Sequence, residues 1–310
     1  MTEKLFYSGF MCMREFYPYI REMPYRLFSC HNSYLSIVEK TARINSQQGI
    51  RLDEIILDSG AFTAWSKGDH ITVQEVAENF HRAMNYFNGQ VDKIWLINLD
   101  VIPGSRGNTA TLDEIKKAMA DSDVNQKRLQ DYFGDRVLPV FHQDEPWERL
   151  DEVMALACDK NYICVSPRND LHESYRRPWA QLIHRKVPGY RTHGLATTGG
   201  PMLLSVPWHS VDSATWIHTA AHGNIGFEVN SRLKWMAIGP KSKRQSVLDQ
   251  HYESMSPERQ DHWKAMVESR GFTIQQLRES FPMRAAFNLM TINRILEQER
   301  EHPSIQTTLF

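Results

Sequence analysis

Short runs of β-branched and aromatic residues recur along the chain, and each is followed by a polar segment that suits a helix. Eight runs fit strands, at residues 4–10, 26–30, 54–58, 94–100, 137–142, 161–165, 189–195 and 208–212. Apolar residues three and four apart predict helices at residues 34–47, 72–87 and 146–157, the second opened by a capping box of Thr72 and Glu75. Eight strands that alternate with helices predict a closed (β/α)8 TIM-type barrel of the α/β class.

An open, doubly wound sheet is the alternative architecture, but no G-x-G-x-x-G motif follows an early strand to support it. We expect the barrel to span residues 1–244. Residues 245–310 hold further helical patterns, and we expect them to form a helical C-terminal extension packed on the barrel.

The composition is typical of a soluble globular protein. The 310 residues are 41% hydrophobic and 24% charged, and no apolar run approaches the roughly 20 residues that span a membrane. The N-terminus lacks the apolar stretch and cleavage site of a signal peptide. None of the four cysteines has zinc or redox spacing, which indicates reduced thiols and a cytoplasmic location: Cys12, Cys30, Cys158 and Cys164.

A basic segment lies between Ser174 and Leu248. Ten Arg and Lys residues against two acids leave it a net charge of +8, in a chain with a formal net charge of −1. Chance clustering on a solvated face is one explanation, and a surface for the phosphates of a polyanion is the other. The candidate nucleic-acid contacts are Arg176, Arg177, Arg232, Lys241, Lys243 and Arg244. Four tryptophans among these bases could stack on nucleobases or fill the core: Trp179, Trp208, Trp216 and Trp235.

Ionisable side chains end several of the expected strands, where the active sites of (β/α)8 barrels lie. They are Asp58, Asp100, His142, His193 and Asp212. Taken alone, the sequence Asp-Ser-Gly at 58–60 is an ordinary turn signal. Five polar strand ends together favour chemistry.

Two kinds of chemistry fit these residue types. A pair of carboxylates can cleave a glycosidic bond, one as the nucleophile and the other as the acid–base group. Histidines with an aspartate could instead bind zinc in a hydrolase, and the candidate ligands are then His142, His193, His209 and Asp212.

Five short motifs, in this order, resemble those of the tRNA-guanine transglycosylase superfamily: LDSGAF, NLDVIPG, PVFHQ, HGLATTG and HSVDSATW. The likeness is strongest to the DNA-acting branch, which holds the 7-deazaguanine DNA transglycosylases of phages and bacteria and related anti-phage DNA glycosylases. It spans roughly residues 5–235. The resemblance implies a barrel that cleaves the N-glycosidic bond of a nucleobase.

The resemblance also implies roles for the strand-end residues. Asp212 matches the nucleophile that attacks C1′ of the nucleotide, and Asp58 matches the acid–base aspartate beside the base. Asp100 matches an aspartate that reads the edge of the bound base. The backbone of Gly194 and Leu195 matches a loop that lines the base pocket.

Three departures from the tRNA enzymes bear on the substrate. His142 stands where they carry a Gln in the base pocket, and Thr197-Thr198-Gly199 replaces their Val-Gly-Glu. Their zinc-binding cysteine motif is absent, since the last cysteine is Cys164. The first two changes argue for a base other than guanine, and the third argues against tRNA.

We therefore expect a DNA glycosylase that excises a modified base from phage DNA, or a DNA transglycosylase that exchanges guanine for a 7-deazaguanine. The expected partners are DNA and a free nucleobase, with no metal, cofactor or membrane. The enzyme would have to flip its target base out of the duplex, which costs a few kcal/mol. A metal-dependent hydrolase and a barrel that only binds nucleic acid are the alternatives, and the retained Asp58 and Asp212 argue against the latter.

Overall fold

The structure is a computed structural model that describes residues 2–9, 15, 17–20, 23–104, 110–157, 161–168, 170–197, 200–229, 232–243 and 249–301. The chain divides into two compact units. The barrel unit comprises Thr2–Cys12 and Met23–Ser213. The hairpin unit comprises Met1, Met13–Glu22 and Ala214–Phe310.

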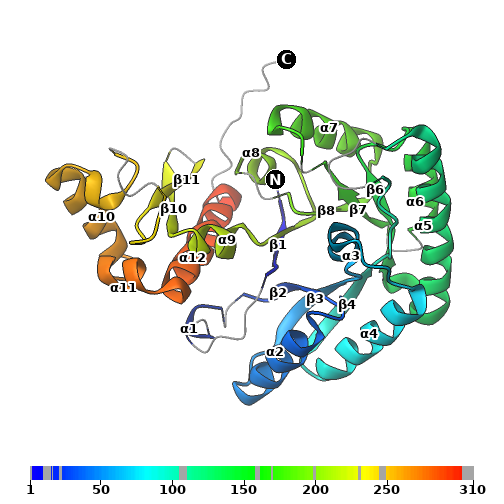
Figure 1. The fold of residues 1–310 in the computed structure, drawn as a ribbon, viewed down its shortest axis with the longest axis horizontal. Coiled ribbons are helices and arrows are strands. Elements are labelled where there is room, and N and C mark those ends of the chain that lie inside the picture. Colours follow the sequence, from blue (N-terminus) through cyan, green and yellow to red (C-terminus); the bar gives the residue numbers. More distant parts are fainter. Residues whose placement is uncertain are drawn as a thin grey trace. The chain divides into compact units, whose positions relative to one another are not determined.

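The barrel unit is a parallel sheet curved into a barrel with helices around it (Figure 1). Its strands are β1 (Lys4–Tyr7), β2 (Tyr25–Ser29), β3 (Leu52–Asp58), β4 (Val91–Ile97), β5 (Val137–Leu138), β6 (Val140–His142), β7 (Tyr162–Ser166), β8 (Arg191–Gly194) and β9 (Ser210–Ser213). Neighbouring strands follow the order β5-β4-β3-β2-β1-β9-β8-β7-β6. The predicted α/β class and TIM-type barrel are confirmed.

Pro139 explains why one predicted strand is divided into β5 and β6. A proline has no amide hydrogen to donate to a neighbouring strand. The pairing therefore changes partner at this residue: β5 pairs with β4, and β6 pairs with β7. The carbonyl of Pro139 still accepts a hydrogen bond from the Cys164 amide at 2.8 Å. Because β5 and β6 stand at the two ends of the strand order, this one extended segment closes the barrel.

The helices of the barrel unit are α2 (Leu35–Gln47), α3 (Ala61–Lys67), α4 (Val73–Tyr86), α5 (Leu112–Phe133), α6 (Glu148–Leu156), α7 (Glu173–Lys186) and α8 (Gly200–Ser205), with a 3-10 turn at Gly134–Arg136. The three predicted helices correspond to α2, α4 and α6. The predicted capping box is confirmed, because the Thr72 hydroxyl accepts from the Glu75 amide and the Glu75 carboxylate accepts from the Thr72 amide. A second capping box, of Thr111 and Glu114, opens α5.

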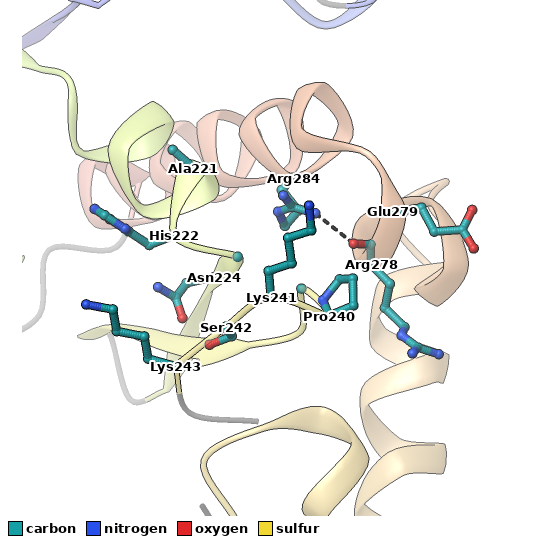
Figure 2. Close-up of a pocket in the computed structure, with 12 residues that line it drawn as sticks. Ala221, His222, Asn224, Pro240, Lys241, Ser242, Lys243, Arg278, Glu279 and Arg284 are labelled. Carbon is teal, nitrogen blue, oxygen red and sulfur yellow. Dashed lines mark hydrogen bonds between the residues drawn. The ribbon is translucent and has the colours of Figure 1, made fainter. Parts of the chain in front are cut away.

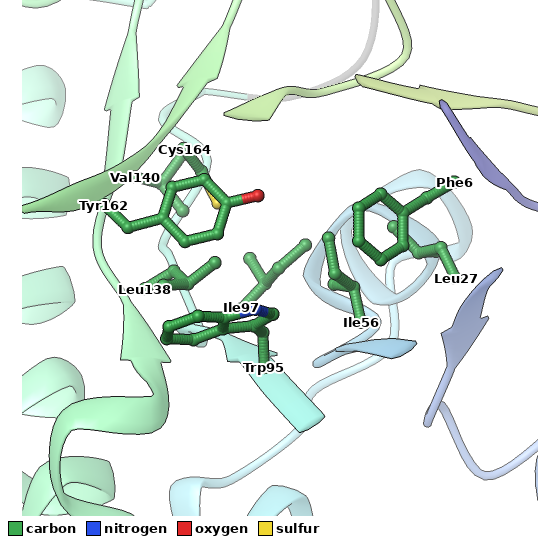
Figure 3. Packing of buried hydrophobic residues seen from close by; sticks show 9 residues of the cluster. All are labelled: Phe6, Leu27, Ile56, Trp95, Ile97, Leu138, Val140, Tyr162 and Cys164. Carbon is green, nitrogen blue, oxygen red and sulfur yellow. The ribbon is translucent and has the colours of Figure 1, made fainter. Parts of the chain in front are cut away.

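Apolar and aromatic side chains fill the barrel interior (Figure 3). The cluster consists of Phe6, Leu27, Ile56, Trp95, Ile97, Leu138, Val140, Tyr162 and Cys164. Trp95 and Tyr162 meet edge to face with ring centroids 5.1 Å apart, an arrangement that aromatic quadrupoles favour. Such a barrel is a packed core and not a pore, so polar chemistry is confined to the strand ends. Cys30 and Cys164 are buried free thiols.

The hairpin unit contains the antiparallel pair β10 (Asn224–Val229) and β11 (Arg232–Ala237). Its helices are α1 (Tyr17–Ile20), α9 (Thr215–Ala221), α10 (Pro257–Glu268), α11 (Ile274–Glu279) and α12 (Phe281–Glu301), with a 3-10 turn at Tyr252–Ser254. Asn288 of α12 ties these elements together: its side chain accepts from the Gly226 amide at 2.7 Å and donates to the Trp216 carbonyl at 3.0 Å.

The division between the units differs from the boundary that we expected at residue 244. The parallel sheet ends with β9, and the barrel unit ends at Ser213. Residues 224–237 pair with one another as a hairpin, and α12 packs on that hairpin, which places this stretch in the second unit. Within the described residues, no helix is both long and apolar enough to cross a membrane.

Candidate active site

Four of the predicted polar residues lie at or just beyond the C-terminal ends of barrel strands. Asp58 is the last residue of β3, and His142 is the last of β6. Asp212 lies in β9, and Asp100 follows β4 after a short turn. Because the strands are parallel, these ends share one edge of the barrel, the edge where barrel enzymes carry their active sites.

Asp212 is almost completely buried, with 9% of its surface exposed. One carboxylate oxygen, Oδ1, accepts the Ala196 amide at 2.7 Å, and Oδ2 accepts the Ser8 hydroxyl at 3.1 Å. Burial raises the pKa of Asp212 to about 6 although both donors favour the ionised form. The carboxylate is therefore ionised near neutral pH and is held in one orientation from two sides, by the residue after β1 and by the turn after β8.

Asp58 lies in a more acidic environment. Burial raises its pKa to about 7, and the charges of Asp100 and Asp212 add to the rise. These Coulombic effects also mean that the three carboxylates lie close enough to influence one another. Near neutral pH, Asp58 is divided between its protonated and ionised forms, as a group that both donates and accepts a proton must be.

The sequence Asp-Ser-Gly at 58–60 forms the turn that its residue types indicate, and the catalytic role of Asp58 stays a prediction. The Gly60 amide donates to Asp58 Oδ2 at 3.2 Å. Gly60 has a φ of +86°, and a Cβ at this position would lie 2.6 Å from the Cβ of His31. Only glycine fits there. The turn starts α3 directly behind β3, which leaves the Asp58 side chain at the barrel rim.

Asp100 and His142 form an ion pair with 2.9 Å between Oδ2 and Nε2. Burial alone would lower the pKa of His142, but the adjacent carboxylate of Asp100 outweighs it and raises the pKa to about 9. His142 is therefore a cation at neutral pH, and the pair presents both a charged donor and an acceptor. The expected role of Asp100 and His142 in reading a base stays a prediction.

His193 is fully buried beside Asp212. Its Nδ1 lies 2.6 Å from the Ser210 hydroxyl, and its Nε2 lies 3.8 Å from Asp212 Oδ1. The Tyr162 hydroxyl hydrogen-bonds to the same Ser210 oxygen. Burial lowers the pKa of His193 to about 3, so its ring is neutral. This arrangement sets an uncharged imidazole against the carboxylate of Asp212.

Gly194 and Leu195 shape the turn that holds Asp212. A Cβ on Gly194 would lie 2.4 Å from the Thr197 hydroxyl oxygen and 3.1 Å from the Trp208 ring, so a larger residue does not fit. The Leu195 amide donates to the Val165 carbonyl at 2.9 Å, and its side chain packs against the barrel core. These contacts position the next amide, that of Ala196, on Asp212.

The zinc alternative receives no support from the geometry. His209, one of its four candidate ligands, pairs with Glu3 at 2.6 Å instead of joining the others. Across the part of the chain that the structure describes, no group of three or more His, Cys, Asp or Glu side chains is placed to hold a metal ion.

The candidate nucleic-acid contacts divide between the two units. Arg176 and Arg177 lie on α7 of the barrel unit, where both are partly buried. Lys241 and Lys243 lie exposed in the hairpin unit, after β11. The Arg232 side chain and Arg244 lie outside the described residues. Among the interleaved tryptophans, Trp208 and Trp216 are fully buried and serve the core.

Sequence reasoning missed two residues that contact Asp212. Ser8 and the Ala196 amide bind Asp212, and nothing in their local sequence signals that contact. Phe62, in the first turn of α3, is 57% exposed, which is unusual for a phenylalanine.

No protein-family model matches the chain, and a search of curated proteins found no match. The fold and the strand-end residues thus define a class, a TIM-type barrel with a cluster of buried carboxylates at the C-terminal ends of its strands.

Proposed function

We propose that the protein cleaves the N-glycosidic bond of a nucleobase in DNA, with Asp212 as the nucleophile and Asp58 as the acid–base group. The observation that carries this proposal is the pair of carboxylates with pKa values of about 6 and about 7 on one barrel rim. Two carboxyl groups on one rim, of which one acts as the nucleophile and the other as the acid, are what such a glycosidic cleavage requires.

In the first step, an oxygen of the Asp212 carboxylate bonds to C1′ of the deoxyribose. The C1′–N bond breaks, and its electron pair passes to the base nitrogen, while protonated Asp58 delivers a proton to the departing base. Exposed Phe62 offers an aromatic face against which a flipped base could stack. The product is a sugar bonded to Asp212 and a free base.

In the second step, ionised Asp58 removes a proton from the group that attacks C1′, and the bond to Asp212 breaks. Water in this role leaves an abasic site, whereas a second base restores a nucleotide with a different base. We favour excision of a modified base, because cationic His142 presents a charged hydrogen-bond donor. The tRNA enzymes that the motifs resemble carry the uncharged amide of a Gln at this position.

The proposal is tested with DNA from phages that carry modified bases, next to an unmodified duplex. Released bases are identified by mass spectrometry, abasic sites are counted with an aldehyde-reactive probe, and covalent adducts are sought by denaturing electrophoresis. We expect base release and an adduct with wild type, no adduct with Asp212→Asn, and slow release with Asp58→Asn.

Asp53→Asn is the matched control, because this exposed aspartate lies on the same strand as Asp58 but away from its C-terminal end. It should behave as wild type. An adduct that survives Asp212→Asn would refute the nucleophile, and a chelator-sensitive activity without an adduct would favour the metal-dependent hydrolase.

A further inference from the structure

The hairpin unit contains a pocket of about 490 Å³, a volume typical of small-molecule sites. Four segments line it: the end of α9 with the turn into β10, the loop after β11, the end of α11 and the start of α12 (Figure 2). All of the lining residues belong to the hairpin unit, so the pocket is complete within it.

Three cations of the pocket have no anionic partner among the described residues. Lys241 and Lys243 are exposed, and neither forms an ion pair with any described residue. Arg284 has only 8% of its surface exposed, and no carboxylate of the described residues pairs with it either. The lining also contains Arg278, which pairs with Glu253, and the carboxylate of Glu279, so its cations still outnumber its anions.

Arg284 is held rigidly by carbonyl groups. Its Nε donates to the Ala220 carbonyl, and its Nη1 donates to the carbonyls of Leu277 and Arg278, each at 2.9 Å. The second terminal nitrogen, Nη2, forms no hydrogen bond within the described residues. Burial lowers the pKa of Arg284, because no anion offsets the loss of water around it. A fixed, partly desolvated guanidinium with a free nitrogen is a ready donor to a phosphate.

Two glycines in the backbone beneath the pocket bring the lysine-bearing loop close to the end of α9. Gly223 has a φ of +77°, and its carbonyl accepts the Gly239 amide at 2.9 Å. A Cβ on Gly239 would lie 2.8 Å from the Cα of Gly223. The two glycines therefore let the lysine-bearing loop cross close over the end of α9, which holds that loop beside Arg284 in the pocket lining.

We propose that this pocket binds a phosphate group of the DNA backbone through Arg284, Lys241 and Lys243. The assignment of DNA as the source of that phosphate rests on the proposed function, whereas the phosphate chemistry rests on the pocket alone. Phosphate matches a planar guanidinium in geometry and two lysines in charge.

The test compares Lys241→Gln/Lys243→Gln with Lys116→Gln/Lys264→Gln in the full-length protein. All four lysines are exposed, so both variants should fold, and both lose the same charge; only the first pair lines the pocket. Binding of an unmodified duplex is measured by fluorescence anisotropy between about 50 and 200 mM chloride, a range over which the affinity due to phosphate contacts falls strongly. Binding of inorganic phosphate is measured by calorimetry at constant ionic strength.

We expect the pocket variant to lose about 0.9 from the log–log salt slope, the contribution of one phosphate contact, and roughly 5-fold in duplex affinity at about 0.15 M salt. It should also lose phosphate binding, while the control keeps both properties. Equal behaviour of the two variants would overturn the proposal. Loss of phosphate binding with an unchanged duplex slope would refute DNA as the source and assign the pocket to a free phosphate. Neither titration requires base release, so these binding results can be positive even if the proposed glycosidic cleavage is refuted.

Discussion

The most direct consequence of the proposed mechanism is a pH optimum that depends on Asp58. In the proposed mechanism, cleavage requires an ionised Asp212 and a protonated Asp58 at the same time. Asp212 ionises with a pKa of about 6, and Asp58 loses its proton with a pKa of about 7. The rate of base release should therefore rise through pH 6 and fall above pH 7, in the bell shape that an acid and a nucleophile produce together.

The size of the effect follows from these two values. Above the pKa of Asp58, the share of enzyme with a protonated Asp58 falls about tenfold for each pH unit, and the rate should fall with it. In Asp58→Asn the proton donor is gone, so the rate at the optimum should fall by about 10²- to 10⁴-fold. The descending limb should disappear with it, whereas the rise through pH 6, which belongs to Asp212, should persist.

The assay is single-turnover base release from a substrate DNA at constant ionic strength. It covers about pH 5 to pH 9, a range that includes the pKa values of both aspartates. Asp53→Asn serves as the control and should reproduce the wild-type bell. A wild-type rate that keeps rising beyond pH 8 would refute the acid role of Asp58. A descending limb that survives in Asp58→Asn would assign that limb to another group.

Stability measured on the same variant separates lost chemistry from lost folding. The pKa of Asp58 is raised in the folded state, from 3.8 to about 7, so wild type loses stability as the pH rises from the lower value through the higher one. Asparagine cannot ionise and avoids this loss. Asp58→Asn should therefore gain about 2–4 kcal/mol in unfolding free energy at pH 8 relative to wild type, and less at pH 5.

Two further predictions test the surroundings of the carboxylates. Gly194→Ala places a Cβ against Thr197 and Trp208, and this overpacking should lower the unfolding free energy by about 1–3 kcal/mol. The measurement is unfolding in urea, and an unchanged midpoint would show that the turn can adjust to the larger side chain. Asp100→Asn removes the partner that raises the pKa of His142, which an NMR titration of the ring should show falling from about 9 toward its ordinary value of 6.5; an unmoved titration would contradict the ion pair.

Much of the barrel could be predicted from local sequence pattern. For example, the apolar run Ile55-Ile56-Leu57 predicts strand β3, and Asp58-Ser59-Gly60 predicts the turn at its end. Parallel strands buried on both faces show as short apolar runs, and runs that alternate with amphipathic helices restrict the chain to few folds. The same logic located Asp58, Asp100, His142 and Asp212, since the barrel places its strand ends together.

The boundary of the barrel could not be predicted in this way. Residues 224–237 are as rich in strand-forming residues as the barrel strands, and their sequence does not say whether they join the parallel sheet or pair with each other. The hairpin packs on α12, and Asn288 of that helix binds the Gly226 amide from 62 residues away. Such distant partners leave no local signal in the sequence.

The chemical state of the carboxylates was decided by the tertiary structure alone. An aspartate has the same ordinary pKa wherever it stands in a sequence, and only burial and neighbouring charges move it. Asp212 owes its orientation to Ser8 and to the Ala196 amide, and Asp58 owes its raised pKa to burial and to two other carboxylates. These groups come from separate strands, so their effect on one another exists only after the barrel has closed and excluded water from its rim.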